Sequence, residues 1–155
     1  ALEADESKFA KLLEYGADAC INVRTCADLG GEVRRLLGSP EGADVTLECS
    51  GNQTSLVNCV MQVAKSGSQV VLVGIVGEPL SQLVLAPVIP REIDLISSFV
   101  YTPEEIRMYL DMLSSGRLSF PGMVTDVIAL DDVVEKGVAR RDRTGQLKIL
   151  IDPSL

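Results

Sequence analysis

The sequence contains no histidine, and its four cysteines, at positions 20, 26, 49 and 59, show none of the close pairs typical of zinc sites. Because imidazoles and paired thiolates are the usual zinc ligands, we expect no metal site in this chain. Cys20 and Cys49 fall within apolar runs that read as strands. This placement favours buried, reduced thiols in a cytoplasmic protein.

Basic residues are also in short supply. The 14 lysines and arginines are outnumbered by 22 acidic residues, which gives a net charge of -8. That charge repels phosphate backbones and anionic lipid surfaces, and no apolar run approaches the roughly 20 residues that cross a bilayer. We therefore expect neither nucleic acid nor a membrane as a partner. Two local clusters, Arg34 with Arg35 and Arg140, Arg141 with Arg143, are interpreted as solvated surface, with a small-anion site as the alternative.

The first residues, ALEADESKF, include no initiating methionine and none of the basic and apolar segments of a targeting peptide. Ala1 and Leu2 read as the end of a strand, which Glu3 closes. An amphipathic helix is expected from Asp5 to Tyr15. The sequence is therefore expected to begin inside a domain.

Apolar strands and helices alternate along the following residues. Strands are expected at 18–23, 43–49, 68–76 and 93–100, and helices at 28–37 and from Asn52 or Thr54 to Ala64. Strands that are continuously apolar and separated by helices indicate a parallel sheet that is covered on both faces. The expected fold class is α/β with a doubly wound parallel sheet.

The character of the sequence changes after Pro79. Pro87 and Pro90 restrict residues 82–86 to a short or edge strand. The segment TPEEIRMYLDMLSSG predicts a helix, because Thr102 can cap it, a proline and two acids occupy its first turn, and Gly116 can end it. The strand VTDVIAL, a helix at 131–139 and the terminal strand LKILI are expected to follow.

Candidate ligand-binding residues lie at the carboxyl ends of the expected strands. In a parallel α/β sheet, ligands bind at these ends, where glycine turns and helix amino termini collect. Glu3, Cys49–Gly51 and Val73–Ile75 all occupy such positions. An acid that ends an early strand can bind the adenosine ribose of a dinucleotide and repel a 2′-phosphate, which favours NAD over NADP. The alternative is a surface glutamate that only starts a helix.

Five segments carry a resemblance to a known family: EADESKFAKLLEYGADACINV, DVTLECSGNQTSL, GSQVVLVGI, REIDLISSFVY and TGQLKILID. In this order and spacing they resemble the carboxyl-terminal half of zinc-type medium-chain dehydrogenases, in the polyol and sorbitol or the threonine dehydrogenase branch. The resemblance covers nearly the whole chain. In that family a first strand and a GxGxxG-type loop precede the acid that Glu3 matches. The resemblance therefore implies an incomplete Rossmann-like sheet that lacks both.

The resemblance also implies roles for individual residues. Glu3 and Lys8 match residues that bind the adenosine ribose. The remaining cofactor-binding matches are Cys49, Ser50 and Gly51 beside the adenosine, Val73, Gly74 and Ile75 at the nicotinamide ribose, Ser98 and Val100 in the segment at the carboxamide, and Lys148 near the pyrophosphate. No catalytic residue or metal ligand is matched, since the family's zinc ligands belong to its preceding half. Asp126 stands where many relatives have the histidine of VTH.

Two functions remain open on these residues. The resemblance implies the cofactor-binding part of an NAD-dependent alcohol or polyol dehydrogenase, not catalytic alone, with zinc held only by the missing half. Residues 1–101 would be a partial cofactor domain, and residues 102–155 would return to the catalytic domain. The alternative is a non-catalytic oligomeric or nucleotide-binding module. A methyltransferase-like fold would not predict the VLVGI and ISSFVY segments.

Two edges of the expected sheet need partners. Without a first strand, the strand of Glu3 and the strand 45–49 each present an exposed edge, unless the sheet closes up, another chain fills the gap, or the natural protein is longer. The apolar region 82–100 is also expected to form a homodimer contact.

Overall fold

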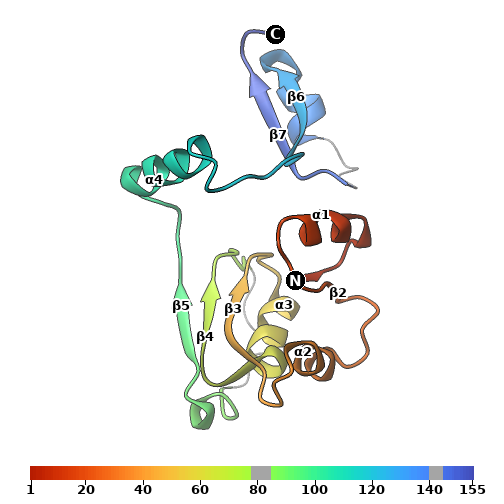
Figure 1. Ribbon diagram of the computed structural model, residues 1–155, viewed down its shortest axis with the longest axis vertical. Coiled ribbons are helices and arrows are strands. Elements are labelled where there is room, and N and C mark those ends of the chain that lie inside the picture. The colour runs from red at the N-terminus through yellow and green to blue at the C-terminus, as the bar shows by residue number, and fades with distance from the viewer. Residues whose placement is uncertain (78–84, 140–144) are drawn as a thin grey trace. The chain divides into compact units, whose positions relative to one another are not determined.

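The computed structural model describes residues 1–77, 85–139 and 145–155. It divides into two compact units, Ala1–Asn22 with Thr102–Leu155 and Val23–Tyr101. All strand pairs in the described ranges are parallel, and helices connect them (Figure 1). The expected α/β class with parallel sheets is therefore confirmed. None of the helices in these ranges combines the length and the apolar character that a bilayer crossing needs.

A three-stranded parallel sheet forms the centre of the unit Val23–Tyr101. Its order is β3 (Ala43–Glu48), β4 (Ala64–Leu72) and β5 (Asp94–Ser97), with β4 in the middle. The register of β3 against β4 shifts between Ala43 and Val45. Beyond this irregularity the two strands pair regularly up to Glu48 opposite Leu72. Their carboxyl ends therefore lie at the same edge of the sheet.

Two helices precede strands in this unit, and side chains cap both. α2 (Leu29–Leu37) begins after Asp28, whose carboxylate accepts a hydrogen bond from the backbone N–H of Gly31 at 2.8 Å. α3 (Gln53–Asn58) begins after Asn52, whose side-chain oxygen accepts from the N–H of Ser55. Of the two caps considered for this helix, Asn52 is the one observed. α3 continues through the π-helical turn η2 (Cys59–Val63), and β4 follows directly.

The core of this unit lies on one face of the sheet. Its buried cluster consists of Leu56, Cys59, Val60, Ala64, Val70 and Val88. Val88 immediately precedes the 3-10 turn η3 (Ile89–Arg91) in the connection from β4 to β5. The helical connection from β3 to β4 and the described end of the connection from β4 to β5 thus pack on the same side.

The opposite face of the sheet is exposed within this unit. Val45 and Leu47 of β3 are 54% and 62% exposed, and Ile96 of β5 is 39% exposed. The continuously apolar sequence of the strands predicted a sheet with helices on both faces. In this unit, the described elements cover only one face of the sheet. The reason is topological, because the described parts of both crossovers join the same core cluster.

Arg91, in the connection between β4 and β5, forms hydrogen bonds with the end of the helical segment α3–η2. Its guanidinium donates to the backbone oxygen of Val60 at 2.9 Å and to that of Ala64. These carbonyls lie at the carboxyl end of the helical segment, where backbone oxygens lack partners within the helix and the helix dipole is negative. The contact therefore satisfies carbonyl groups that the helix leaves unpaired.

The unit formed by Ala1–Asn22 and Thr102–Leu155 begins with a short parallel pair. β1 (Leu2–Glu3) pairs with β2 (Ile21–Asn22), and the 3-10 turn η1 (Glu6–Lys8) and α1 (Phe9–Glu14) connect them. In the described part of the chain, β1 pairs only with β2, and β3 only with β4. Pairing between β1 and β3, the alternative in which the sheet closes up, is therefore not observed among the described residues.

The rest of this unit starts with α4 (Pro103–Ser114), which Thr102 caps as predicted and which also has a reciprocal capping box. Thr102 Oγ1 accepts from the N–H of Glu105, and the Glu105 carboxylate accepts from the N–H of Thr102. β6 (Val124–Ala129) and β7 (Lys148–Asp152) form a second parallel pair. The helix expected at 131–139 is instead a 3-10 turn, η4 (Leu130–Asp132), followed by a π-helical turn, η5 (Val133–Val138).

Aromatic and polar contacts join the two chain segments of this unit. Tyr15 and Phe120 pack edge to face with ring centroids 5.5 Å apart. The Tyr15 hydroxyl and Lys11 Nζ both donate to the backbone oxygen of Pro121, at 3.0 and 3.1 Å. α1 is thereby attached to the loop that precedes β6.

Several expected boundaries and burials are wrong. The strands expected at 18–23, 68–76 and 93–100 are shorter or shifted, at Ile21–Asn22, Ala64–Leu72 and Asp94–Ser97. Of the expected strand 82–86, residues 82–84 lie outside the described ranges, and 85–86 are not in a strand. Cys20 is only half-buried and Cys49 is exposed, whereas Cys59 is buried. Cys59 is buried because the helical segment that contains it packs against the sheet, within the core cluster.

The buried hydroxyl of Thr46 in β3 allows a test of the packing in the unit Val23–Tyr101. Its hydroxyl oxygen is buried and, among the described residues, makes no hydrogen bond. Since a buried hydroxyl without a partner retains its desolvation cost, we expect Thr46→Val to raise the free energy of unfolding by about 1 kcal/mol in a urea titration.

Thr125→Val is the matched control. Thr125 Oγ1 donates to the backbone oxygen of Lys148 and accepts from the N–H of Leu147. This substitution should lower the free energy of unfolding by about 0.5–1 kcal/mol, because it removes hydrogen bonds that are made. Equal destabilisation by both variants would contradict the assignment of Thr46.

Candidate functional site

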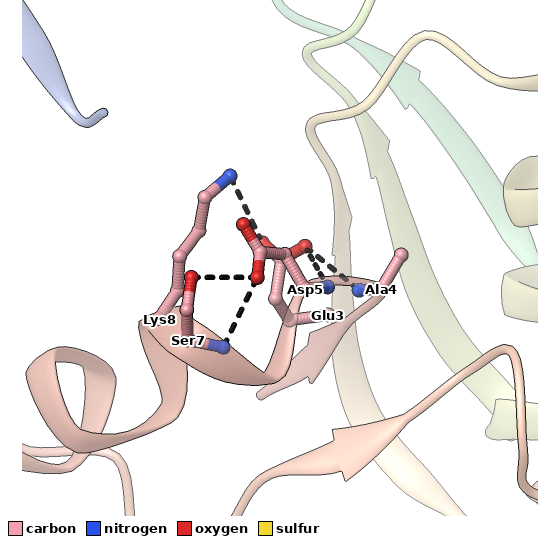
Figure 2. Close-up of polar contacts among 5 residues, drawn as sticks. All are labelled: Glu3, Ala4, Asp5, Ser7 and Lys8. Carbon is pink, nitrogen blue, oxygen red and sulfur yellow. Dashed lines mark hydrogen bonds and ion pairs between the residues drawn. The ribbon is translucent and has the colours of Figure 1, made fainter. Parts of the chain in front are cut away.

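Glu3 ends β1 and closes the turn that leads into η1 (Figure 2). Its Oε1 accepts from the backbone N–H groups of Ala4 and Asp5, at 2.7 and 3.0 Å. Its Oε2 lies 3.9 Å from Nζ of Lys8. The structure therefore brings the two predicted ribose-binding residues together, with a carboxylate that the backbone orients and a lysine that faces it.

Asp5 fixes the start of the helical segment that carries Lys8. Its Oδ1 accepts from the backbone N–H of Ser7 at 3.0 Å and from the Ser7 hydroxyl at 2.6 Å (Figure 2). The hydrogen bond from the Ser7 hydroxyl is the main reason that the pKa of Asp5 lies below its ordinary value. Lys8 follows Glu3 by five residues in the sequence. The capped turn brings its side chain back to face the Glu3 carboxylate.

The predicted turns after β3 and β4 lie against each other. The backbone oxygen of Glu48 accepts from the N–H groups of Val73 and Gly74, both at 2.8 Å. A Cβ atom added to Gly74 would overlap the backbone nitrogen of Gly51, and one added to Gly51 would lie 2.6 Å from the oxygen of Ile75. The sequence-predicted segments Cys49–Gly51 and Val73–Ile75 therefore form one structure, with contact between their backbones.

Glu48 is a residue of this site that the sequence analysis missed. It is 1% exposed, and its Oε1 accepts from the N–H and the hydroxyl of Ser50, while its Oε2 accepts from the N–H of Gly51 at 3.0 Å. The sequence carries a signal for this arrangement. In TLECSG, a glutamate is followed two residues later by a serine and then by a glycine, a pattern in which side chain and backbone can bond locally.

The hydrogen bonds keep Glu48 ionised. Burial raises its pKa, but hydrogen bonds from Ser50, Ser55 and Gly51 outweigh burial and hold the pKa below its ordinary value. Burial, together with this negative charge, raises the pKa of the Cys59 thiol to about 11 and raises that of Cys49. Both thiols are therefore protonated at neutral pH, so neither is an activated nucleophile.

The segment after β5 lies next to the turn after β4. The N–H of Ser98 donates to the backbone oxygen of Leu72, which directly precedes Val73. Val100 adopts a left-handed backbone with φ +49°, which is strained for a β-branched residue. Both residues are exposed, and Val100 is 70% exposed. The structure therefore brings Ser98 to the same sheet edge as Glu48 and Gly74.

The remaining cationic candidates lie elsewhere. Lys148 is exposed in β7, where it pairs with Val124. Arg35 donates to Glu32 in α2, which agrees with a surface interpretation of its cluster. Arg140, Arg141 and Arg143 lie outside the described residues. Glu3, Lys8 and Lys148 belong to one unit, and the turns after β3, β4 and β5 belong to the other.

The zinc of the resembled family does not fit the side chains described here. The chain has no histidine. In residues 1–77, 85–139 and 145–155, no group of three or more cysteine, aspartate or glutamate side chains is arranged to hold a metal ion. We therefore derive no chemical step through zinc from these residues.

Solved structures define the fold class of the chain. The chain superposes on 2R,3R-butanediol dehydrogenase from Bacillus subtilis with a TM-score of 0.83 and 24% identity, over 99% of the chain and 43% of that structure. It superposes on a Sinorhizobium meliloti protein with bound NADP with a TM-score of 0.84 and 24% identity, over 98% of the chain and 44% of that structure. The fold is thus the Rossmann-like α/β fold of dehydrogenase domains.

The family follows from sequence. Residues 1–115 match the family model described as zinc-binding dehydrogenase. Rat sorbitol dehydrogenase is 32% identical over 99% of the chain and 42% of its own length. The chain belongs to the zinc-binding dehydrogenase family and corresponds to its carboxyl-terminal, cofactor-binding half. It spans about 42% of the length of rat sorbitol dehydrogenase and of an alcohol dehydrogenase from Cupriavidus necator.

Gly74 tests the contact between the two turns. Gly74→Ala should lower the free energy of unfolding by about 1–3 kcal/mol, because its methyl group would collide with backbone and with the Glu48 carboxylate. Gly77→Ala is the matched control, since a Cβ at that position meets no atom within 4 Å. Urea unfolding of both variants measures the difference. Equal stability of the two variants would show that the turns are not in contact.

Proposed function

We propose that this chain binds NAD as the cofactor-binding part of a zinc-type alcohol or polyol dehydrogenase. The observation that carries the proposal is the position of Glu3, which presents a backbone-oriented carboxylate beside Lys8 at the carboxyl end of a parallel strand. Parallel α/β folds bind dinucleotides at these strand ends. Family membership and the likeness to sorbitol dehydrogenase support the polyol class.

Glu3 and Lys8 are assigned to the adenosine ribose. A carboxylate offers about four acceptor positions, and the backbone N–H groups of Ala4 and Asp5 use two of those on Glu3. Ribose hydroxyls are donors that suit the remaining positions, and Lys8 can donate to a ribose oxygen. The negative charge of Glu3 would repel the 2′-phosphate of NADP, which is why we propose NAD.

The turns of the other unit are assigned to the rest of the cofactor. Cys49, Ser50 and Gly51 would pass the adenosine, and Val73, Gly74 and Ile75 would contact the nicotinamide ribose. Val73 and Ile75 are 46% and 76% exposed, so both offer apolar surface at the strand end. Backbone groups of Ser98 and Val100 would bind the carboxamide, and Lys148 would lie near the pyrophosphate.

The chemistry of hydride transfer is assigned to the whole enzyme. In the whole enzyme the nicotinamide would supply the hydride acceptor and zinc, for which the described side chains offer no site, would supply a Lewis acid; the role of this chain would be to hold and orient the cofactor. Residues 1–101 are proposed as the partial cofactor domain and residues 102–155 as the segment that returns to the catalytic domain. We propose a cytoplasmic location, in keeping with the unpaired cysteines of the described structure.

The second candidate function is an oligomeric module without catalysis, and the exposure of β5 favours it. In the described residues β5 pairs only with β4, so its other edge is open. Leu95 and Ile96 are 41% and 39% exposed, although both are large and apolar. An open edge with apolar side chains is a template for pairing with a second copy. We therefore propose a homodimer through the 82–100 region.

Titration with reduced cofactor tests the proposed function. Adding the chain to NADH should enhance the nicotinamide fluorescence, and NADPH should bind at least about tenfold more weakly if Glu3 repels the 2′-phosphate. Glu3→Gln should weaken NADH binding about tenfold, because it removes a charged acceptor of hydroxyl groups, and should narrow the difference between the two cofactors.

Glu104→Gln is the control, because it makes the same charge change on an exposed residue of α4. Its affinities should equal those of the unchanged chain. A silent NADH titration would exclude the cofactor-binding function and leave the oligomeric module as the remaining candidate.

Light scattering after size exclusion tests the homodimer. The chain should elute at twice its 16.6 kDa, and Ile96→Lys should produce the monomer, because a lysine on an edge strand opposes pairing. Val127→Lys places the same charge on an exposed residue of β6 and should leave the dimer intact. A monomeric unchanged chain at micromolar concentration would exclude this interface.

A further inference from the structure

Among the charged side chains of residues 1–77, 85–139 and 145–155, Glu48 is the most completely buried, with 1% of its surface exposed. An ionised carboxylate in a protein interior is costly unless its oxygens accept hydrogen bonds or face a cation. Among the ion pairs of the described residues, none involves Glu48. Its charge is therefore balanced by N–H and hydroxyl dipoles at the end of β3.

The donors to the side chain and to the backbone oxygen of Glu48 belong to the two turns assigned to the cofactor. The side chain of Glu48 accepts three hydrogen bonds from the first turn, two from Ser50 and one from Gly51. Its backbone oxygen accepts two from the second turn, from Val73 and Gly74 at 2.8 Å each. One residue therefore holds both turns, with its carboxylate on one and its carbonyl on the other.

Close approach makes this arrangement sensitive to small changes. The Glu48 carboxylate also contacts the second turn, since a Cβ atom on Gly74 would lie 2.7 Å from Oε2. Gly51 adopts φ +66°, a conformation that glycine tolerates. The backbone N–H groups of Ser50 and Gly51, which both donate to the Glu48 carboxylate, hold the backbone in this conformation. A change in the carboxylate is therefore transmitted directly to the backbone of both turns.

We propose that Glu48 is a positioning residue for the dinucleotide, which it does not touch, because its ionised side chain sets the backbone of the two cofactor-binding turns. This inference rests on the proposed function of those turns. The low pKa of Glu48, which its hydrogen bonds maintain against burial, agrees with a carboxylate that stays ionised at neutral pH.

Replacing the carboxylate with an amide is the sharpest perturbation. Glutamine keeps the shape of the side chain but exchanges one acceptor oxygen for an NH2 donor. In one orientation that donor faces the N–H of Gly51, and in the other it faces the N–H of Ser50. Either orientation places two donors against each other, so the turn that contains Ser50 and Gly51 must move, and its contact with Gly74 passes that movement to the second turn.

The experiment compares Glu48→Gln with the unchanged chain in two measurements. The first is NADH titration at a temperature well below thermal unfolding. We expect the dissociation constant to rise about tenfold, the effect of losing one hydrogen bond to a charged group, while far-ultraviolet circular dichroism stays the same. The second is amide hydrogen exchange of the free chain, in which residues 50–51 and 73–74 should exchange faster while the β4 core is unchanged.

Glu41→Gln is the matched control, since Glu41 is an exposed glutamate in the loop before β3. It removes the same charge and should change neither measurement. Ser50→Ala removes one hydroxyl donor and leaves the buried carboxylate in place. Amide exchange at residues 73–74, which lie in the other turn, should become faster, and this readout decides the question if Glu48→Gln does not fold. Unchanged exchange at 73–74 would overturn the inference.

The outcomes separate this inference from the proposed function. If the unchanged chain does not bind NADH, the proposed function fails, and hydrogen exchange then decides whether Glu48 sets the two turns. If the unchanged chain binds NADH and a folded Glu48→Gln binds it equally well, the positioning role is excluded while the proposed function stands. If affinity falls only in proportion to a loss of thermal stability, with uniform exchange, the role of Glu48 is structural and the inference is overturned.

Discussion

The requirement to satisfy a buried carboxylate determines the geometry at the end of β3. Once Glu48 points into the interior, its oxygens need donors, and the nearest are the N–H groups two and three residues further along. The backbone must therefore turn back sharply, which places a glycine at 51 and leads directly to the cap of α3 at Asn52. The neighbouring turn can approach this one only because position 74 also lacks a side chain.

The two units obtain their order in different ways. The unit Val23–Tyr101 contains the buried cluster of apolar side chains, and its sheet edge is tied by the hydrogen bonds of Glu48. In the other unit, helix starts are fixed by local polar contacts, as at Asp5 and Thr102, and the two chain segments meet through Tyr15. Polar caps thus start helices in both units, as at Asp28 and Asn52 in the unit Val23–Tyr101, and the described apolar cluster is what this unit has in addition.

How much the sequence could predict depended on the range of the interactions. The cap at Thr102 was predicted, and Asn52 was one of two candidates for the cap of α3, because the signals for a helix start lie within four residues. The turns at Gly51 and Gly74 were predicted as strand ends and by resemblance. The burial of Glu48 was not, since a glutamate in ADVTLEC resembles a surface acid until the fold of Ser50 and Gly51 is known. The bare sheet face at Leu47 likewise depends on which side both crossovers take.

Arg91 has no proposed role in cofactor binding, yet the geometry of its hydrogen bonds limits which side chains could replace it. Its planar fork reaches two carbonyl oxygens at once, those of Val60 and Ala64. A lysine carries the same charge on a single point and cannot reproduce that bridge. The shape of the cation, and not only its sign, is thus what a substitution of Arg91 would have to preserve, even though the residue lies in a connection between strands, where substitutions are usually tolerated.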